Sequence, residues 1–390
     1  MASPPILIAG AGIGGLALAL ALQRKGFCVK IFERAAAVGD VGAGIALGAT
    51  PSRSLYALGL EQALKAVSDA PLASAAFDYK TGEVLGGAFA KRNWKASDLV
   101  DVNMLHRADL FTVLKTAIDA NDPAAVELDS QVVGYEQGPN DATAILADGR
   151  RVSGQALIGC DGIRSTIRTQ MFGASDPRKT GRVAYRFLVP IADAAPFMGA
   201  GSAGIYVGSR VALARYMIRK GTLVNCVAFA HVPDMDGEGW SQQATRDELL
   251  ALFDGWHSDV VGLAACAPLE RTARWALYDR DPLDTWIDGR VGLLGDSAHP
   301  VLPFLGFGAA LGIEDAIVLA RAFEQASSPV EALRLYQAAR LPRANAVLLE
   351  SRRQGEQFDA GPGQAVEIPT SERESRVAYD PMTTPLLEPA

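Results

Sequence analysis

The stretch ILIAGAGIGG, residues 6–15, decides the fold. Its first four residues form a continuous apolar run, which is typical of a strand buried on both faces of a parallel sheet. Gly10, Gly12 and Gly15 follow with the spacing G-x-G-x-x-G, and residues 16–25 are rich in helix formers. A strand, a glycine-rich turn and a helix in this order predict a phosphate-binding βαβ unit.

The chain downstream of this turn supports that interpretation. Gly26 can end the helix, and residues 28–32 (CVKIF) read as a second strand. That strand ends in Glu33, eighteen residues after Gly15, where a carboxylate can bind an adenosine ribose. We therefore expect a dinucleotide site; a tight turn that only packs a helix on a sheet is the structural alternative. The motif alone does not separate NAD from FAD, but Glu33 would repel the 2′-phosphate of NADP.

A second G-x-G-x-x-G occurs at residues 199–204, where the context differs. Residues 205–207 (IYV) look like a strand and not a helix, and no acid ends a following strand at the right distance. We predict a glycine-rich loop there.

Composition excludes several classes of function. The 390 residues are 49% hydrophobic and 21% charged, which indicates a globular chain with a large core. The net charge of −7 argues against nucleic acid and anionic membranes as partners. The four cysteines form no C-x-x-C and the four histidines no H-E-x-x-H, so we expect free thiols and no metal site. No apolar run is long enough to span a membrane, and residues 1–5 are too short for a signal peptide, so we expect a cytoplasmic protein.

Two further stretches read as a buried strand that ends in an acid and leads to a helix. In residues 156–168 (ALIGCDGIRSTIR), Asp161 can make the turn and Ser165 can cap the helix, which an ordinary β-to-α connection would also show. In residues 290–316, Asp296 can bind sugar-alcohol hydroxyls. A glycine-opened helix then begins near residue 308, and its N–H groups can stabilise the negative charge of a reduced flavin ring.

These three motifs, in this order, resemble the single-component (class A) FAD-dependent aromatic hydroxylases, which have the para-hydroxybenzoate hydroxylase fold. Within that family the chain is most similar to the salicylate hydroxylase and 6-hydroxynicotinate 3-monooxygenase branch. The resemblance covers roughly residues 5 to 350. The further segments that fit the branch are 41–48 (VGAGIALG), 106–110 (HRADL), 183–190 (VAYRFLVP) and 379–381 (YDP).

The resemblance implies which residues hold FAD. In this family Ala46 would lie near the isoalloxazine edge, Arg107 near the pyrophosphate or ribityl chain, and Val132 would offer backbone groups to the adenine. Asp161 would lie near both FAD and the nicotinamide donor, and Arg34 would join Glu33 unless it is a solvated surface residue. The complete set is Gly10, Gly12, Gly15, Glu33, Arg34, Ala46, Arg107, Val132, Asp161, Asp296, Gly308 and Ala309.

The chain departs from its relatives at positions that bear on substrate. Hydroxynicotinate enzymes carry a histidine at the position of Ala46, which puts that substrate in doubt. Where the branch has glutamine in L-G-Q-G, this chain has Phe307. An arginine that faces the pocket could bind a substrate carboxylate, but on an alternating strand only one of Arg215 and Tyr216 can face inward. Arg215 on a solvent face is the alternative, and Arg186 is a similar candidate from the neighbouring strand.

The activity that the resemblance implies is hydroxylation of a small aromatic or N-heteroaromatic acid, salicylate-like or hydroxybenzoate-like. In that family NADH or NADPH would reduce FAD, and O2 would then give a flavin C4a-hydroperoxide as the hydroxylating species. Tyr216, Tyr185 or His231 would activate a ring hydroxyl, with Arg215 as a fourth catalytic candidate. Pro300 and Pro303 would form a wall beside the flavin, with Arg186 in the same substrate pocket.

We therefore predict an α/β fold: a Rossmann-like FAD-binding domain (GR2-type) with an inserted, mostly antiparallel substrate domain and a C-terminal helix. The FAD-binding domain would comprise residues 1–75, 100–175 and 277–350, and the substrate domain 76–99 and 176–276. Residues 330–358 read as one long helix with five arginines on a solvated face, and 351–390 as the helix end and a tail packed on the body or a neighbour.

Two other functions stay open from sequence alone. An NAD-dependent dehydrogenase would use the first glycine motif but leaves residues 290–316 without a role. A non-catalytic flavin-binding protein would use all three motifs. The aromatic ring that is attacked, any accompanying decarboxylation, the choice of NADH or NADPH, and a monomer or homodimer state are not encoded in these patterns.

Overall fold

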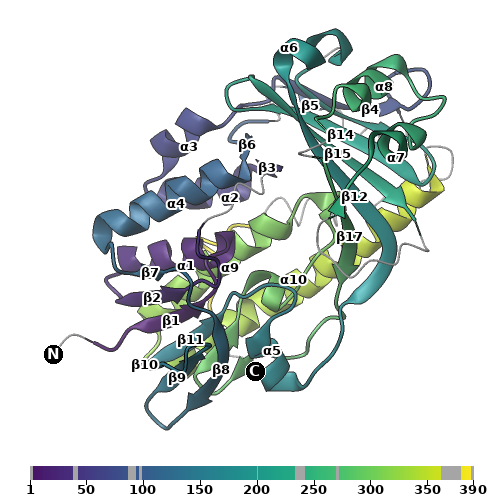
Figure 1. Ribbon diagram of the computed structural model, residues 1–390. Helices are drawn as coiled ribbons and strands as arrows, with labels where there is room; N and C mark the ends of the chain where they lie inside the picture. The colour runs from purple at the N-terminus through teal and green to yellow at the C-terminus, as the bar shows by residue number, and fades with distance from the viewer. Residues whose placement is uncertain are drawn as a thin grey trace.

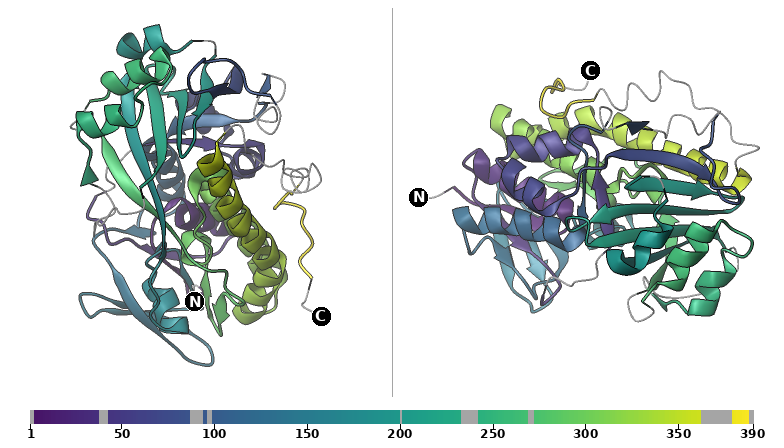
Figure 2. Two further views of the ribbon diagram at one scale, coloured as in Figure 1. Left: turned by 90° about the vertical axis from the view of Figure 1, so that its right-hand side faces the viewer. Right: turned by 90° about the horizontal axis from the view of Figure 1, so that it is seen from above.

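The computed structural model describes residues 3–37, 43–86, 94–95, 99–199, 201–232, 242–268, 272–361 and 379–387. Two large β-sheets lie at opposite ends of the molecule (Figure 1). The long helix α10 (Pro329–Ala360) runs from one sheet to the other, as two further views show (Figure 2). In the described parts of the chain, no helix is long and apolar enough to cross a bilayer, and no group of three potential metal ligands gathers.

The first sheet has six strands in the order β18-β19-β11-β1-β2-β7. All neighbours pair in parallel except β18 and β19. The strands are β1 (Ile6–Ala9), β2 (Val29–Phe32), β7 (Val126–Glu127), β11 (Ala156–Gly159), β18 (Ile287–Asp288) and β19 (Val291–Leu293). The predicted strands at residues 6–9 and 28–32 are confirmed.

Helix α1 (Ile13–Arg24) packs between α4 (Arg107–Asn121) and α9 (Gly308–Gln325) beside this sheet. Every residue from Gly15 to Leu22 is buried, because the short Ala and Leu side chains allow contacts on all sides of the helix. The predicted helix end is confirmed: Gly26, just past the helix, has φ +82°.

The second sheet has eight strands in the order β16-β17-β12-β15-β14-β13-β4-β5 and is antiparallel except where β13 meets β4. The strand predicted at residues 205–207 is present, as are the two strands predicted to carry Arg186 and to carry Arg215 with Tyr216. The loop predicted at 199–204 is also confirmed, because a strand and not a helix follows it. The strands are β4 (Ala73–Asp78), β5 (Trp94–Lys95), β12 (Arg178–Pro190), β13 (Ala203–Val207), β14 (Val211–Ile218), β15 (Leu223–His231), β16 (Gln242–Gln243) and β17 (Ala273–Asp279).

Each sheet has its own apolar core. One lies between the six-stranded sheet and helices α1, α4, α9 and α10. The other lies on the outer face of the eight-stranded sheet, under α7 (Arg246–Ala251) and α8 (Ser258–Ala265). The opposite, inner face of that sheet is therefore turned toward the rest of the molecule (Figure 1).

Smaller elements complete the fold. The pair β3–β6 contacts the inner face of the eight-stranded sheet: the N–H of Gly44, which opens β3, donates to Asn225 Oδ1 on β15 at 2.6 Å. These elements are β3 (Gly44–Leu47), β6 (Asn103–His106), β8 (Val132–Gln137), β9 (Ala142–Leu146), β10 (Arg151–Gly154), α2 (Ala49–Ala57), α3 (Glu61–Val67), α5 (Thr166–Phe172) and α6 (Ile191–Ala194).

The long C-terminal helix is confirmed, but its predicted solvated arginine face is wrong for three of the five arginines. Arg340 is fully buried and pairs with Glu314 and Asp315 of α9. Arg343 also pairs with Glu314, and Arg352 reaches the end of β17. Acids that lie far away in the sequence neutralise these arginines. The sequence pattern of α10 alone could therefore not show that they are paired. The two arginines exposed as predicted are Arg334 and Arg353.

The predicted packing of the tail on the body is confirmed for residues 379–387. The ring of Tyr379 lies 4.0 Å from the guanidinium carbon of Arg343, and Arg321 donates to the carbonyl of Pro381 at 2.7 Å. The rest of the tail, residues 41–42 of the VGAGIALG segment, and residues 87–93 and 96–98 of the predicted substrate domain lie outside the described residues.

Candidate cofactor and substrate site

Four parallel strands of the six-stranded sheet end at one edge, and each leads into residues that the sequence singled out. Gly10 follows β1, Glu33 follows β2, Asp161 lies just past β11, and Asp296 lies just past β19. Ligands of open parallel sheets bind outside the carboxyl ends of the strands. The fold therefore gathers all three predicted motifs at the edge where a dinucleotide would bind.

The three glycines of the first turn serve different purposes. Gly10 has φ +102°, and a methyl group there would approach the carbonyl oxygen of Cys160 to 2.5 Å. A methyl group on Gly15 would collide with the carbonyl of Gly10. A methyl group on Gly12 would meet no protein atom within 4 Å, and its backbone is extended. The fold itself requires Gly10 and Gly15, whereas only a closely approaching ligand requires Gly12.

Glu33 fixes the turn at the same time as it faces the site. Its Oε2 accepts from the N–H of Ala11 at 2.8 Å, and its side chain is half-buried. Its carbonyl accepts from the N–H of Ser130 at 2.8 Å, which brings Val132 close by at the start of β8. Arg34 is exposed.

Asp161 has a structural role, as the turn interpretation predicts. Its Oδ2 accepts from the N–H groups of Thr166 at 2.7 Å and Ile167 at 3.3 Å, at the start of α5. Ser165 caps the same helix as predicted, accepting from the N–H of Arg168. The Oδ1 of Asp161 has no hydrogen-bond partner among the described residues, and burial raises the pKa of this carboxyl. One oxygen is thus left for a ligand.

Asp296 is exposed to solvent, yet protein surrounds it so densely that burial raises the pKa of its carboxyl. Asp296 is therefore open to a ligand at this edge although protein packs around it. His299 and Arg107 act in the opposite direction and lower that pKa. Arg107, the first residue of α4, is therefore near Asp296, as expected of two residues that share one cofactor.

Helix α9 begins beside Asp296 with Gly308 and Ala309, and no side chain caps its N-terminus. Its first N–H groups have no partner within the helix and carry the positive end of the helix dipole. The start of α9 lies against α1 through Gly14 and Gly312, where a methyl group on Gly312 would come within 3.4 Å of the Gly14 Cα. Two uncapped helix N-termini thus lie at the same edge.

These features fit FAD. Gly12 leaves room that no protein atom fills, and the Oδ1 of Asp161 has no partner among the described residues. Asp296 is exposed, and two helix N-termini offer free N–H groups. FAD needs partners of these kinds in this order along its length. They serve its adenosine ribose, its pyrophosphate, its ribityl chain and the edge of its flavin ring.

Sequence analysis missed a buried charge cluster that holds the Asp296 turn from behind. Asp315 Oδ2 accepts from the N–H of Gly295 at 3.0 Å and lies 2.6 Å from His299 Nε2, while Arg340 donates to Oδ1 at 2.7 Å. His299 and Arg340 lower the pKa of Asp315 to about 2. The signal was available: two acids in the otherwise apolar helix sequence LGIEDAIVLA need buried partners.

The eight-stranded sheet separates the predicted substrate residues by face. Arg215 and Tyr185 lie on the outer face, in or beside the core under α7 and α8. Arg215 is fully buried and donates to the carbonyls of Met198 and Gly201, so its solvent-exposed alternative is wrong. This placement does not favour the predicted catalytic role of either residue.

Tyr216 and Arg186 lie on the inner face, so the parity argument is confirmed. Tyr216 packs in one apolar cluster with Met104 and Ala46, and Ala46 is the residue expected beside the flavin. Arg186 and Tyr216 influence each other's pKa, and Arg107 lowers the pKa of Arg186. Arg107 thus acts electrostatically on both Arg186 of the inner face and Asp296 of the cofactor edge.

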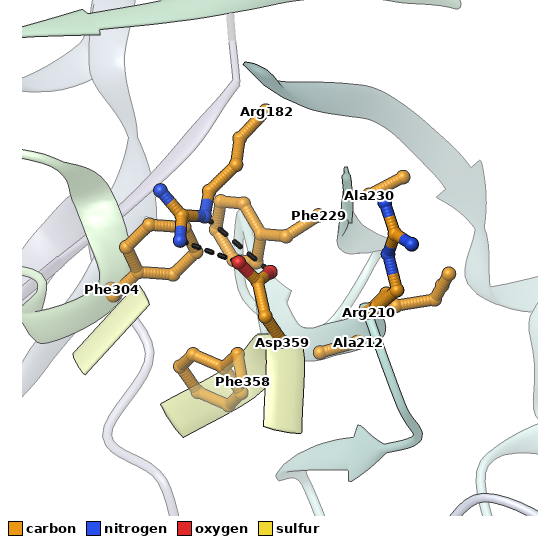
Figure 3. Close-up of a pocket in the computed structure, with 9 residues that line it drawn as sticks. Arg182, Arg210, Ala212, Phe229, Ala230, Phe304, Phe358 and Asp359 are labelled. Atoms are coloured by element: carbon orange, nitrogen blue, oxygen red, sulfur yellow. Dashed lines mark hydrogen bonds and ion pairs between the residues drawn. The ribbon is translucent and has the colours of Figure 1, made fainter. Parts of the chain in front are cut away.

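His231 lies on the inner face as well, but six residues along β15 from the partner of Tyr216, which is roughly 20 Å away along the strand. Its Nδ1 is 3.1 Å from Asp359 at the end of α10. Asp359 also pairs with Arg182 beside a small pocket lined by Phe229 and other residues (Figure 3). This placement separates His231 from Tyr216 and does not favour its predicted catalytic role.

The two predicted wall prolines flank the turn between β19 and α9. Pro300 is buried, and Pro303 is half-buried at the start of a short 3-10 helix, Pro303–Leu305. The ring of Phe304 in that helix packs on the ring of Phe229 on the inner face, with 5.1 Å between the two ring centres. The proline segment therefore connects the cofactor edge with the inner face.

Comparisons with known proteins agree with this geometry. The family model described as an FAD binding domain matches residues 4–351. The chain is 33% identical to 3-hydroxybenzoate 6-hydroxylase 1 of Aquipseudomonas alcaligenes, over 89% of this chain and 87% of that one. It is 31% identical to 6-hydroxynicotinate 3-monooxygenase of Bordetella bronchiseptica, over 88% and 89%. A salicylate hydroxylase substrate complex superposes with a TM-score of 0.81 at 27% identity, covering 97% and 96%.

The match extends over both sheets and the helix between them, and all three cofactor motifs occupy one edge. The FAD family model excludes the dehydrogenase alternative, and the relatives are named as monooxygenases and hydroxylases. The protein is therefore an FAD-dependent monooxygenase, and the chain belongs to the single-component (class A) flavoprotein aromatic hydroxylases.

Proposed function

We propose that the protein hydroxylates a small aromatic or N-heteroaromatic acid of the hydroxybenzoate kind, with NADH or NADPH as electron donor and O2 as oxidant. The observation that carries this proposal is that Tyr216 on the inner face packs in one cluster with Ala46 of β3, while the three cofactor motifs lie at one edge of the six-stranded sheet. A polar and aromatic surface opposite a flavin site suits a planar acid. Relatives named for hydroxybenzoate and hydroxynicotinate support that substrate class.

In this proposal the N–H groups at Gly12 and the start of α1 receive the pyrophosphate, and Glu33 binds the adenosine ribose. Asp296 binds the ribityl chain, and the start of α9 donates to the flavin edge near Gly308 and Ala309. When bound, FAD supplies electron transfer and oxygen activation. The protein binds, orients and excludes water around the ring.

Tyr216 is the residue that we propose to contact the substrate ring. Burial raises the pKa of its hydroxyl, so this group stays protonated at neutral pH and can donate a hydrogen bond to a ring oxygen. Pro300 and Pro303 form the stiff wall beside it. Tyr185, Arg215 and His231 are left outside this site because of the faces and strand positions that they occupy.

The domain division follows the sheets. We propose an FAD-binding domain of residues 1–75, 100–175 and 277–350 and an inserted substrate domain of 76–99 and 176–276. Strand β4 begins at Ala73, three residues before the proposed start of the substrate domain at residue 76. Strand β17 ends at Asp279, three residues after the proposed end of that domain at residue 276. A monomer or homodimer in the cytoplasm completes the proposal.

A substrate panel tests the activity. The purified protein should be yellow, and hydroxybenzoates and hydroxypyridine carboxylic acids should stimulate NADH or NADPH oxidation and yield products heavier by one oxygen atom in mass spectrometry. Stimulated oxidation that yields only hydrogen peroxide with every acid would contradict the proposal and would favour a flavin-binding protein without hydroxylase function.

A further inference from the structure

A row of side chains crosses the middle of the inner face of the eight-stranded sheet. The pairing register aligns one residue from each of β12, β15, β14 and β13 in this central row, namely Arg186, Val227, Ala214 and Ile205. All of them except Val227 are partly exposed. On one side the central row adjoins Tyr216, which packs with Ala46 of β3 and Met104 of β6. The pair β3–β6 therefore bounds the central row on that side.

Three phenylalanine rings bound the central row on its other side. Phe229 lies two residues along β15 from Val227, so its position is roughly 7 Å away along the strand, and its side chain is partly exposed. The ring centres of Phe229 and Phe304 are 5.1 Å apart, and those of Phe304 and Phe358 are 5.5 Å apart. We call these three residues the phenylalanine cluster. Ile205 of the central row packs against this cluster, so the two are in direct contact.

Polar contacts hold the phenylalanine cluster in place. Asp359, next to Phe358 at the end of α10, pairs with Arg182 of β12, and the three rings surround this pair (Figure 3). The Nδ1 of His231 lies 3.1 Å from the same carboxylate. The carbonyl of Phe358 accepts from the N–H of Arg210 at 3.3 Å. The cavity among the rings measures about 10 Å³, which is room for about one water molecule. The cluster is thus a packed boundary that moves only if these contacts break.

We propose that the phenylalanine cluster limits the substrate to a single aromatic ring, and that Phe229 is the residue that a fused second ring would meet. This inference rests on the proposed function and specifies it: the substrate ring lies over the central row, between Tyr216 and Phe229. A monocyclic acid fits between these two boundaries. A bicyclic acid that extends along the strands toward Phe229 collides with a ring that has no free space behind it, and such a clash excludes a competing ligand.

Paired titrations measure this limit and need no turnover. FAD-loaded protein is titrated with a hydroxybenzoate and with the hydroxynaphthoates that carry the same hydroxyl and carboxyl arrangement, and the flavin absorbance change gives each dissociation constant. Wild-type protein should bind the hydroxybenzoate at least about tenfold more tightly than any of the hydroxynaphthoates. Phe229→Ala should bind at least one hydroxynaphthoate about 10- to 100-fold more tightly than wild type does. Phe229→Leu, which keeps an apolar contact with Phe304, should show a smaller gain in the same direction.

Phe197→Ala is the matched control. Phe197 is also a half-buried phenylalanine, but its ring packs on Gly262 of α8 at the outer face of the sheet. Its loss should therefore leave the preference for one ring unchanged. Thermal unfolding and flavin content show that each variant is folded and loaded.

Three outcomes overturn the inference: a wild-type protein that binds hydroxynaphthoates as tightly as hydroxybenzoates, an unchanged preference in both Phe229 variants, or an equal loss of the preference in Phe197→Ala. A preference that depends on Phe229 without any hydroxylated product would sustain the size limit and contradict only the proposed function. Hydroxylation of a hydroxybenzoate together with a preference that does not depend on Phe229 would overturn only the size limit.

Discussion

At the scale of single residues, the first glycine motif separates what the fold needs from what the cofactor needs. Gly10 and Gly15 touch backbone carbonyls, whereas Gly12 faces space that no protein atom fills. The spacing G-x-G-x-x-G does not reveal this difference, since all three positions read alike in the sequence. The structure assigns the requirement for Gly12 to the ligand.

Gly12→Ala should therefore fold normally and lose cofactor. We expect unchanged thermal unfolding of the FAD-free protein and at least about tenfold weaker FAD binding, because the methyl group enters the space of the pyrophosphate. Gly15→Ala is the contrasting variant: its methyl group collides with the carbonyl of Gly10 and should cost about 1–3 kcal/mol of unfolding free energy. Calorimetry and flavin fluorescence titration measure the two effects. A stable Gly15→Ala protein would contradict the assignment.

Asp315 gives a prediction with a defined pH dependence. Its pKa is lowered to about 2, below the usual value of about 3.9. The ionised carboxylate therefore stabilises the folded state at every pH above about 3.9, and this stabilisation is lost as the pH falls toward 2. Asp315→Asn should lose about 3 kcal/mol of unfolding free energy at pH 7, because Arg340 and His299 lose a buried partner. The difference in unfolding free energy between Asp315→Asn and the wild-type protein should be smaller by about 1 kcal/mol at pH 3 than at pH 7.

Urea unfolding at the two pH values measures that gap. Glu61→Gln is the control, since this exposed acid pairs with Lys65 on the same helix and its loss should change the unfolding free energy by less than about 0.5 kcal/mol. A gap that widens as the pH falls would contradict the direction of the shift.

At the scale of elements, the sequence predicted those features that depend on local pattern. The apolar run of β1, the glycine after α1, the Ser165 cap and the alternation of β14 were readable because neighbouring residues determine them. Parity separated Arg215 from Tyr216 but could not say which face meets the flavin, since that depends on how two sheets pack. The prediction of a solvated arginine face on α10 was wrong for the same reason, because the acids that pair with these arginines lie on α9 and β17.

The described part of the tail makes one element-scale prediction. Tyr379 lies over Arg343 and Arg340, at 4.0 and 5.0 Å from the guanidinium carbons, while its buried hydroxyl has no hydrogen-bond partner among the described residues. Tyr379→Ala should cost about 2 kcal/mol, through the loss of cation–π contacts and packing. Tyr379→Phe should be neutral, because it keeps the ring. Chemical denaturation compares the two, and equal losses would show that the hydroxyl matters instead.

At the scale of the whole molecule, the two sheets are tied together by several polar contacts. Helix α10 is the longest tie: Tyr336 near its start donates to the carbonyl of Leu293 in β19, and Arg352 near its end pairs with Asp279 in β17. The contact of Gly44 with Asn225 is a second tie. The proposed substrate site belongs to one sheet and the proposed cofactor edge to the other, so the proposed function requires this coupling.

The coupling predicts that FAD stabilises both sheets although the cofactor edge belongs to one. Trp286 is buried in the core of the six-stranded sheet, and Trp256 packs on Phe253 beside the eight-stranded sheet. In variants that retain either Trp286 or Trp256 as the single one of the chain's five tryptophans, fluorescence should report coincident urea transitions. FAD at 100 times its dissociation constant should raise the unfolding free energy at both probes by about 2.7 kcal/mol. If only the Trp286 transition moved, the sheets would be independent units, and α10 would carry no coupling between substrate and cofactor.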